Sequence, residues 1–119
     1  MSAGKVLNHP QLGQIKGVHL PEGGTQFRNL LYATIPERWQ HSVVVDDLRA
    51  HAAGGAPYDA TKWGPIAPQP DGTINFDFGL IQKSLPLDHD ITCDEDSCLN
   101  LVLTTPSTTP DTLLPVIVL

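Results

Sequence analysis

The sequence predicts a mostly β chain with long irregular loops and little helix, and three observations support this prediction. Prolines and glycines make up 21 of the 119 residues, which is above the roughly 12 % of average proteins. Short β-branched or aliphatic runs stand between turn-forming residues, as is typical of strands. Residues 58–90 show no sustained period of either kind. Hydrophobic residues make up 40 % of the chain, so we expect a small core.

The first expected element is an antiparallel hairpin. Apolar residues alternate in part of residues 12–18, and residues 25–32 are rich in aliphatic and aromatic side chains. Between them, residues 21–24 read Pro-Glu-Gly-Gly, which is a strong turn signal. This order predicts two paired strands joined by a glycine-rich loop.

The middle of the chain predicts less regular structure. A short β-branched run spans residues 41–45, and residues 46–53 suit one or two helical turns that begin near Asp46 or Asp47. From residue 58 to 90 we expect a coil that wraps over a larger body or serves as a functional loop. Only a weak helical pattern, at residues 78–83, interrupts it.

The last third predicts two strands. Residues 99–104 form a good strand, and residues 105–112 have the composition of a turn or linker. Residues 113–119 are almost entirely aliphatic, as in a strand buried on both faces of a parallel sheet. Such an apolar strand promotes aggregation when it is exposed to solvent. We therefore expect the chain to be incomplete or to have a partner.

Charge and cysteine usage exclude several function classes. The net charge is −6, with 13 acidic and 7 basic side chains and no basic cluster, so we expect no nucleic-acid partner. The sequence shows neither a signal peptide nor the ~20 apolar residues of a membrane span. Cys93 and Cys98 are expected to be free thiols in a reducing compartment. These features predict a cytoplasmic chain that does not enter a membrane.

A series of motifs over residues 11–119 resembles the N-terminal part of type-B carboxylesterases, with fungal members the most similar. The resemblance implies that residues 1–119 form a partial domain, an α/β-hydrolase N-terminal fragment with an antiparallel hairpin followed by strands of the central sheet. It implies that the full-length relative hydrolyses carboxylic esters. The motifs are Gly13–Gly17, Phe27–Ala33, Arg38-Trp39, Ala60–Gln69, the acidic box Asp94–Leu101 and the strand Pro115–Leu119.

The chain departs from this family pattern at several positions. Ala67 stands where the family has a cysteine that pairs with the one at Cys98, so that disulfide cannot form. Asn29 and Leu31 replace a family glycine and a family proline, and Val102 replaces an asparagine. The missing cysteine agrees with a reducing compartment.

No catalytic residue is expected in this chain. An α/β-hydrolase needs a Gly-x-Ser-x-Gly elbow, an oxyanion loop, an acid and a histidine, and the sequence contains no Gly-x-Ser-x-Gly. In the family the oxyanion loop and the triad follow the position of Leu119. We therefore predict that the chain alone is inactive, that no cofactor is bound, and that an ester substrate binds only to a full-length form.

The residues singled out by the resemblance have structural roles. Arg38 and Glu95 are expected to form an ion pair that ties the region after the hairpin to the acidic box, with plain surface charge as the alternative. Trp39 and Trp63 are expected to be packing residues, and contact with substrate in the active-site gorge is the alternative. Cys98 belongs to the same structural set.

No metal site is predicted. His89 lies between two aspartates and near Cys93, but a solvated loop accounts for this cluster better than a zinc site. The acidic run 88–96 lacks the central glycine of a calcium loop.

Two other interpretations stay open. The chain could be an interaction module that self-associates, or docks on a partner chain, through the exposed sheet edge of its C-terminal strand, residues 113–119. It could also be a small independent β domain, and then it would unfold cooperatively.

Overall fold

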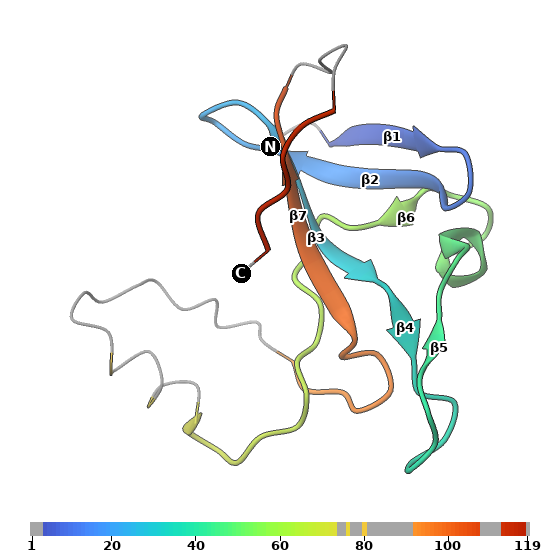
Figure 1. Ribbon diagram of the computed structural model, residues 1–119, viewed down its shortest axis with the longest axis vertical. Helices are drawn as coiled ribbons and strands as arrows, with labels where there is room; N and C mark the ends of the chain where they lie inside the picture. Colours follow the sequence, from blue (N-terminus) through green and yellow to red (C-terminus); the bar gives the residue numbers. More distant parts are fainter. Residues whose placement is uncertain (1–3, 74–75, 77–79, 81–91, 108–112, 119) are drawn as a thin grey trace.

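A computed structural model describes residues 4–73, 76, 80, 92–107 and 113–118 of the chain. Strands predominate among the described elements, which confirms the predicted mostly β character (Figure 1). A short 3₁₀ helix, η1, spans Leu48–His51. One sheet has five strands: β1 (Lys5–His9), β2 (Gly13–His19), β3 (Thr25–Leu31), β6 (Tyr58–Asp59) and β7 (Asn100–Thr105). A two-stranded ribbon contains β4 (Ala33–Thr34) and β5 (Val43–Val44).

The predicted hairpin is formed by β2 and β3, which run antiparallel. Its turn is closed by a hydrogen bond from the Gly23 amide to the Leu20 carbonyl, at 3.0 Å. Gly23 and Gly24 have φ values of 91° and 103°, a region that side chains other than glycine rarely adopt. The glycine-rich turn signal therefore had a conformational cause.

Beyond the turn, β2 and β3 separate, and Ala60 fills the gap between them. The Ala60 amide donates to the Lys16 carbonyl at 2.9 Å, and the Ala60 carbonyl accepts from the Arg28 amide at 2.8 Å. Ala60 follows β6, which pairs in parallel with β2. This fully buried alanine joins the two strands where they no longer pair directly.

The core is small and lies between the sheet and η1. Asp47 caps η1 by accepting from the Arg49 amide at 2.9 Å, so the helical turn predicted at residues 46–53 is confirmed. The Leu48 side chain enters the core and is 1 % exposed. The core cluster consists of Ile15, Phe27, Leu48, Tyr58 and Ala60.

The strand predicted at residues 99–104 is confirmed as β7, which pairs antiparallel with β3 at the end of the strand order β1-β2-β3-β7. Three consecutive apolar residues of β7, Leu101, Val102 and Leu103, are each at least 40 % exposed. Because successive strand residues point to opposite faces, both faces of the sheet are open at β7.

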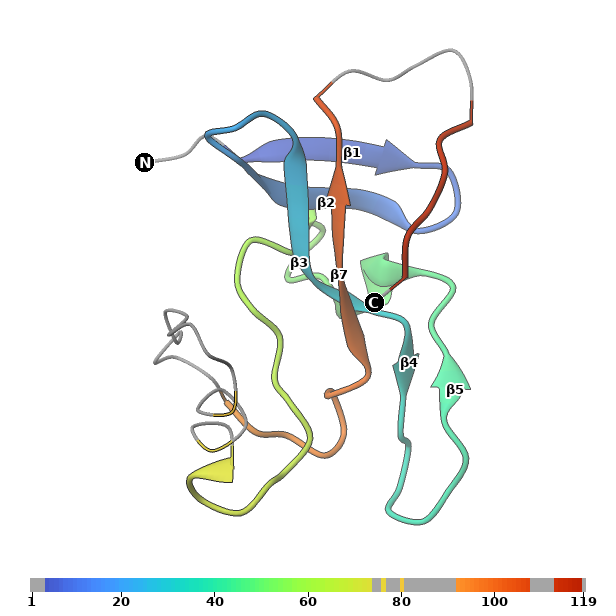
Figure 2. The same cartoon turned by 60° about the vertical axis from the view of Figure 1, so that its left-hand side comes forward.

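The prediction of a strand at residues 113–119 is wrong for residues 113–118, because these residues form no strand. Figure 2 shows this run passing β7 without joining the sheet. A strand needs a neighbouring backbone to pair with, and Pro115 lacks the amide donor. The side chains are exposed instead, with Leu113 at 102 % and Val118 at 88 %.

Other differences concern short or polar elements. Strand β1 pairs antiparallel with β2 and was not predicted, because Lys5–His9 carries a polar residue at three of its five positions. The two-residue strand β6 was also missed. The weak helical pattern at residues 78–83 lies outside the described residues except for Leu80, and so does most of the linker 105–112.

Candidate functional site

The structure brings Arg38 and Glu95 together, although they lie 57 residues apart in the sequence. Arg38 lies in the connection between β4 and β5, and Glu95 lies in the turn before β7. The Arg38 Nη2 atom donates to both Glu95 carboxylate oxygens, at 2.7 and 2.9 Å, and Nε donates at 3.2 Å. This contact raises the pKa of Arg38, first through the hydrogen bond and then through charge attraction. The side chains are 66 % and 48 % exposed, so the pair positions the ribbon more than it stabilises the fold.

The acidic box forms a turn that presents Glu95 to Arg38. The Asp94 carboxylate accepts from the Asp96 amide at 2.7 Å and from the Ser97 amide at 3.2 Å. These backbone hydrogen bonds lower the pKa of Asp94. The Cys98 thiol donates to the Glu95 carbonyl at 3.5 Å, which closes the turn.

The segment after Trp63 runs along this turn. The Asn100 side-chain amide donates to the Pro65 carbonyl at 2.8 Å. Ile66 bridges to the acidic box in parallel fashion, because its amide donates to the Thr92 carbonyl and its carbonyl accepts from the Asp94 amide. Gly64 lies so close to Asn100 that a Cβ atom would collide with that side chain. Three motifs of the resemblance therefore meet here: Arg38-Trp39, Ala60–Gln69 and the acidic box.

Of the two tryptophans that were expected to pack, Trp63 contacts another side chain and Trp39 does not. The Arg28 guanidinium lies 4.9 Å from the centre of the Trp63 ring, a cation–π contact, and Trp63 is 45 % exposed. Trp39 does not pack within the described fold, because it is 96 % exposed. The backbone φ of Trp39 is 72°, which differs from the negative φ of an extended strand residue.

Cys93 and Cys98 are both free thiols, as predicted. Cys93 is exposed and Cys98 is half-buried. Ala67, which stands where the family that the sequence resembles has a cysteine, is exposed.

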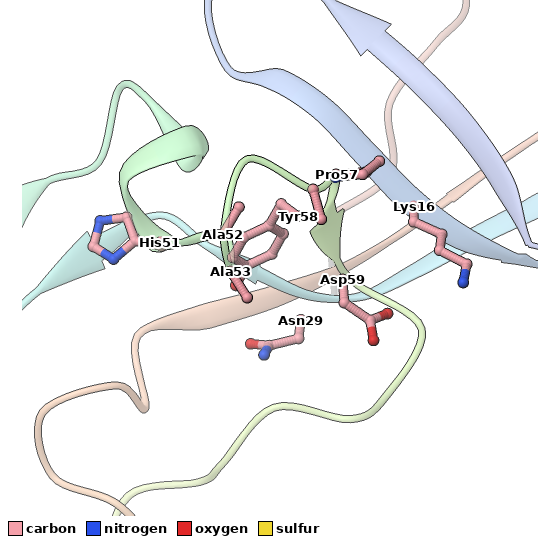
Figure 3. A pocket seen from close by; sticks show the side chains of 9 residues that line it. Lys16, Asn29, His51, Ala52, Ala53, Pro57, Tyr58 and Asp59 are labelled. Atoms are coloured by element: carbon pink, nitrogen blue, oxygen red, sulfur yellow. The ribbon is translucent and has the colours of Figure 1, made fainter.

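A pocket of about 540 Å³ lies beside β6 and η1 and was not predicted from the sequence. Figure 3 shows that its polar side chains do not converge: the His51 ring and the Asp59 carboxylate lie on different sides of Tyr58, and the Lys16 side chain extends away. The Asp59 carboxylate accepts instead from Thr61, at 2.6 Å from the hydroxyl and 3.1 Å from the amide. These hydrogen bonds lower the pKa of Asp59. The arrangement does not couple a nucleophile to a base.

Two observations concern metal-ligating side chains and membrane-spanning helices in the described part of the chain. No group of three or more His, Cys, Asp or Glu side chains gathers there, and His89 lies outside it. Within the same residues, no helix has the length and apolar character needed to cross a bilayer.

Comparison with known proteins gives one partial similarity. The chain is 43 % identical over 51 residues to Lipase 3 of Yarrowia lipolytica. The match covers 43 % of this chain but 9 % of that lipase. No protein-family profile matches the chain, and no solved structure matches it. The similarity is to a lipase or esterase, and it covers a small part of one.

Proposed function

We propose that this chain is the N-terminal part of a carboxylic ester hydrolase of the type-B carboxylesterase family, and that it carries no catalytic residue itself. The partial match to Lipase 3 is the observation that supports a lipase-like or esterase-like relationship. The narrower family assignment rests on the order of motifs in the sequence. Three of the six motifs lie close together around Arg38 and Glu95, which is compatible with this assignment.

In this proposal the chain supplies structure rather than chemistry. It contains no Gly-x-Ser-x-Gly, and the pocket beside β6 holds a histidine and an aspartate that do not meet. Acyl transfer needs a nucleophile, a base and oxyanion donors in one place. The chain would contribute the hairpin, the β4–β5 ribbon and strand β7 to a larger hydrolase. An ester substrate would then bind only to the full-length form.

A hybrid enzyme tests this proposal. The full 119-residue chain replaces the N-terminal stretch of Lipase 3 that corresponds to it under this proposal and that includes the 51 aligned residues. Ester hydrolysis is then measured with a chromogenic short-chain ester. We expect the hybrid to keep activity within about tenfold of Lipase 3, which corresponds to about 1.4 kcal/mol in the barrier. A matched hybrid with the same residues in scrambled order should be inactive. If the two hybrids are equally inactive, the proposal fails.

The absence of catalysis in the isolated chain has a separate test. We expect a fluorophosphonate probe to leave the chain unmodified, because no activated serine is available. Lipase 3 treated in parallel is the positive control. Stoichiometric labelling of the chain would refute this part of the proposal.

A second candidate function is a noncatalytic interaction module. Residues 113–118 form no strand, so the predicted docking edge cannot be theirs. The function is favoured instead by β7, an uncharged strand with open faces that ends the strand order among the described residues. Self-association or capture of a partner strand at this edge predicts a sedimentation coefficient that rises with concentration. A monomer at all concentrations would exclude self-association at this edge.

We place the chain in the cytoplasm as part of the same proposal. Two free thiols, one of them exposed, suit a reducing compartment. Localisation of a tagged chain by microscopy tests this, and secretion into the medium would contradict it.

A further inference from the structure

Trp39 stands at a strained turn in the connection between β4 and β5. The Gln40 amide donates to the Glu37 carbonyl at 3.1 Å, which closes a four-residue turn over Glu37–Gln40. Trp39 is the third residue of this turn, and its φ is 72°. That position and angle normally require glycine or asparagine. Among the described residues, no other residue apart from glycine has a positive φ.

The strain has no compensating contact within the described fold. Trp39 is 96 % exposed, and two more apolar residues of the same ribbon, Val43 and Val44, are 54 % and 76 % exposed. Figures 1 and 2 both show the β4–β5 ribbon projecting from the sheet. Backbone strain that surrounding structure maintains is concentrated at functional sites.

The turn is nevertheless held in one place. Arg38 makes three hydrogen bonds with Glu95, and the Gln40 side chain donates to the Glu37 carboxylate at 2.9 Å. The Arg38–Glu95 pair connects the turn to the segment that leads into β7. An apolar ring is thus presented to solvent from a fixed position, which reduces the ordering cost of a docking contact.

We infer that Trp39 is a docking anchor, and that its partner is the body of the hydrolase of which this chain is a part. This inference rests on the proposed function. The 51 matched residues are 9 % of Lipase 3, so that lipase has about 570 residues, and most of them lie outside the match. Such a body is large enough to cover the ribbon and the open faces of β7.

A protein surface fits these residues better than a lipid surface. Tryptophan is one of the residue types most enriched among the energetically dominant contacts of protein interfaces. Arg38 already pairs with Glu95 and so is not free for lipid phosphates. The net charge of −6 opposes binding to anionic membranes.

The test compares Trp39→Gly in two settings. In the isolated chain, we expect the thermal midpoint to stay the same or to rise, because glycine relieves the backbone strain and no contact is lost. In the Lipase 3 hybrid, we expect the midpoint of thermal inactivation to fall by at least about 3 °C, because the anchor is lost. Trp39→Phe in the hybrid should recover most of this loss.

The outcomes separate the two proposals. If the parent hybrid is inactive, the proposed function fails and this inference fails with it. If the parent hybrid is active but Trp39→Gly leaves its midpoint unchanged, the docking role is wrong and the proposed function stands. An equal fall in both settings would mean that Trp39 supports only the chain itself. A blue shift of tryptophan emission on neutral phosphatidylcholine vesicles, lost in Trp39→Ala, would assign the ring to a lipid surface and overturn the inference.

Discussion

Replacing Gly17 with alanine tests how tightly the small core is packed. A Cβ atom at Gly17 would lie 2.8 Å from two carbon atoms of the Phe27 ring and 2.9 Å from the Gln26 carbonyl oxygen. Phe27 is 3 % exposed and belongs to the core cluster, so the ring has little room to move. Overpacking of this kind costs about 1–3 kcal/mol. The lower entropy of the unfolded alanine chain offsets about 0.4–1 kcal/mol of it.

We therefore expect Gly17→Ala to lower the free energy of unfolding by roughly 1–2 kcal/mol. Urea unfolding followed by circular dichroism measures this change. Gly4→Ala is the matched control, because the close neighbour at Gly4 is the flexible end of the Lys16 side chain, at 2.6 Å from the added Cβ. An unchanged urea midpoint in Gly17→Ala, or an equal loss in Gly4→Ala, would refute the packing argument.

Three further predictions follow from the described contacts. Arg38→Ala should shift the thermal midpoint by less than about 2 °C, and high salt should produce the same small shift, because the pair with Glu95 is exposed. The hydrogen bonds with Thr61 lower the pKa of Asp59 in the folded chain. The Asp59 carboxylate therefore stabilises the fold fully at pH values above its unfolded pKa of about 3.9, and this stabilisation is lost as the pH falls through the lower folded pKa. In the Asp59→Asn variant, the free energy of unfolding should therefore decrease less as the pH is lowered below about 4. A thiol reagent should modify Cys93 faster than Cys98, because Cys93 is exposed and Cys98 is half-buried; equal rates would contradict the described burial.

The sequence predicted those elements whose cause is local. The turn at residues 21–24 follows from glycines that adopt positive φ, and η1 follows from Asp47 as its cap. Strand β7 follows from its aliphatic run. Strand β6 and the joint at Ala60 could not be predicted in this way, because two residues carry no period and the joint depends on strands from elsewhere in the chain.

The ion pair between Arg38 and Glu95 was expected only through the family resemblance. Residues 57 positions apart leave no signal in local periodicity, and each side chain alone reads as surface charge. The pocket beside β6 was missed for a related reason. Its lining comes from β2, β3, η1 and the segment that leads into β6, so only the tertiary fold assembles it.

One group of disagreements between sequence and structure concerns apolar side chains that lie exposed. Alternation along β2 agrees with burial, since Ile15 and Gly17 are buried and their neighbours are not. Trp39 was expected to pack, and residues 113–118 were expected in a strand buried on both faces, but both lie exposed. The apolar residues 101–103 of β7, for which no burial was predicted, are exposed as well. If the hydrophobic pattern of this chain predicted burial poorly, apolar residues of the hairpin would also be exposed. They are not, because burial in the hairpin follows the pattern. The exposed residues therefore indicate surfaces that suit an apolar partner, and Trp39 provides the sharpest test of this idea because its backbone strain has no compensating contact in the described fold.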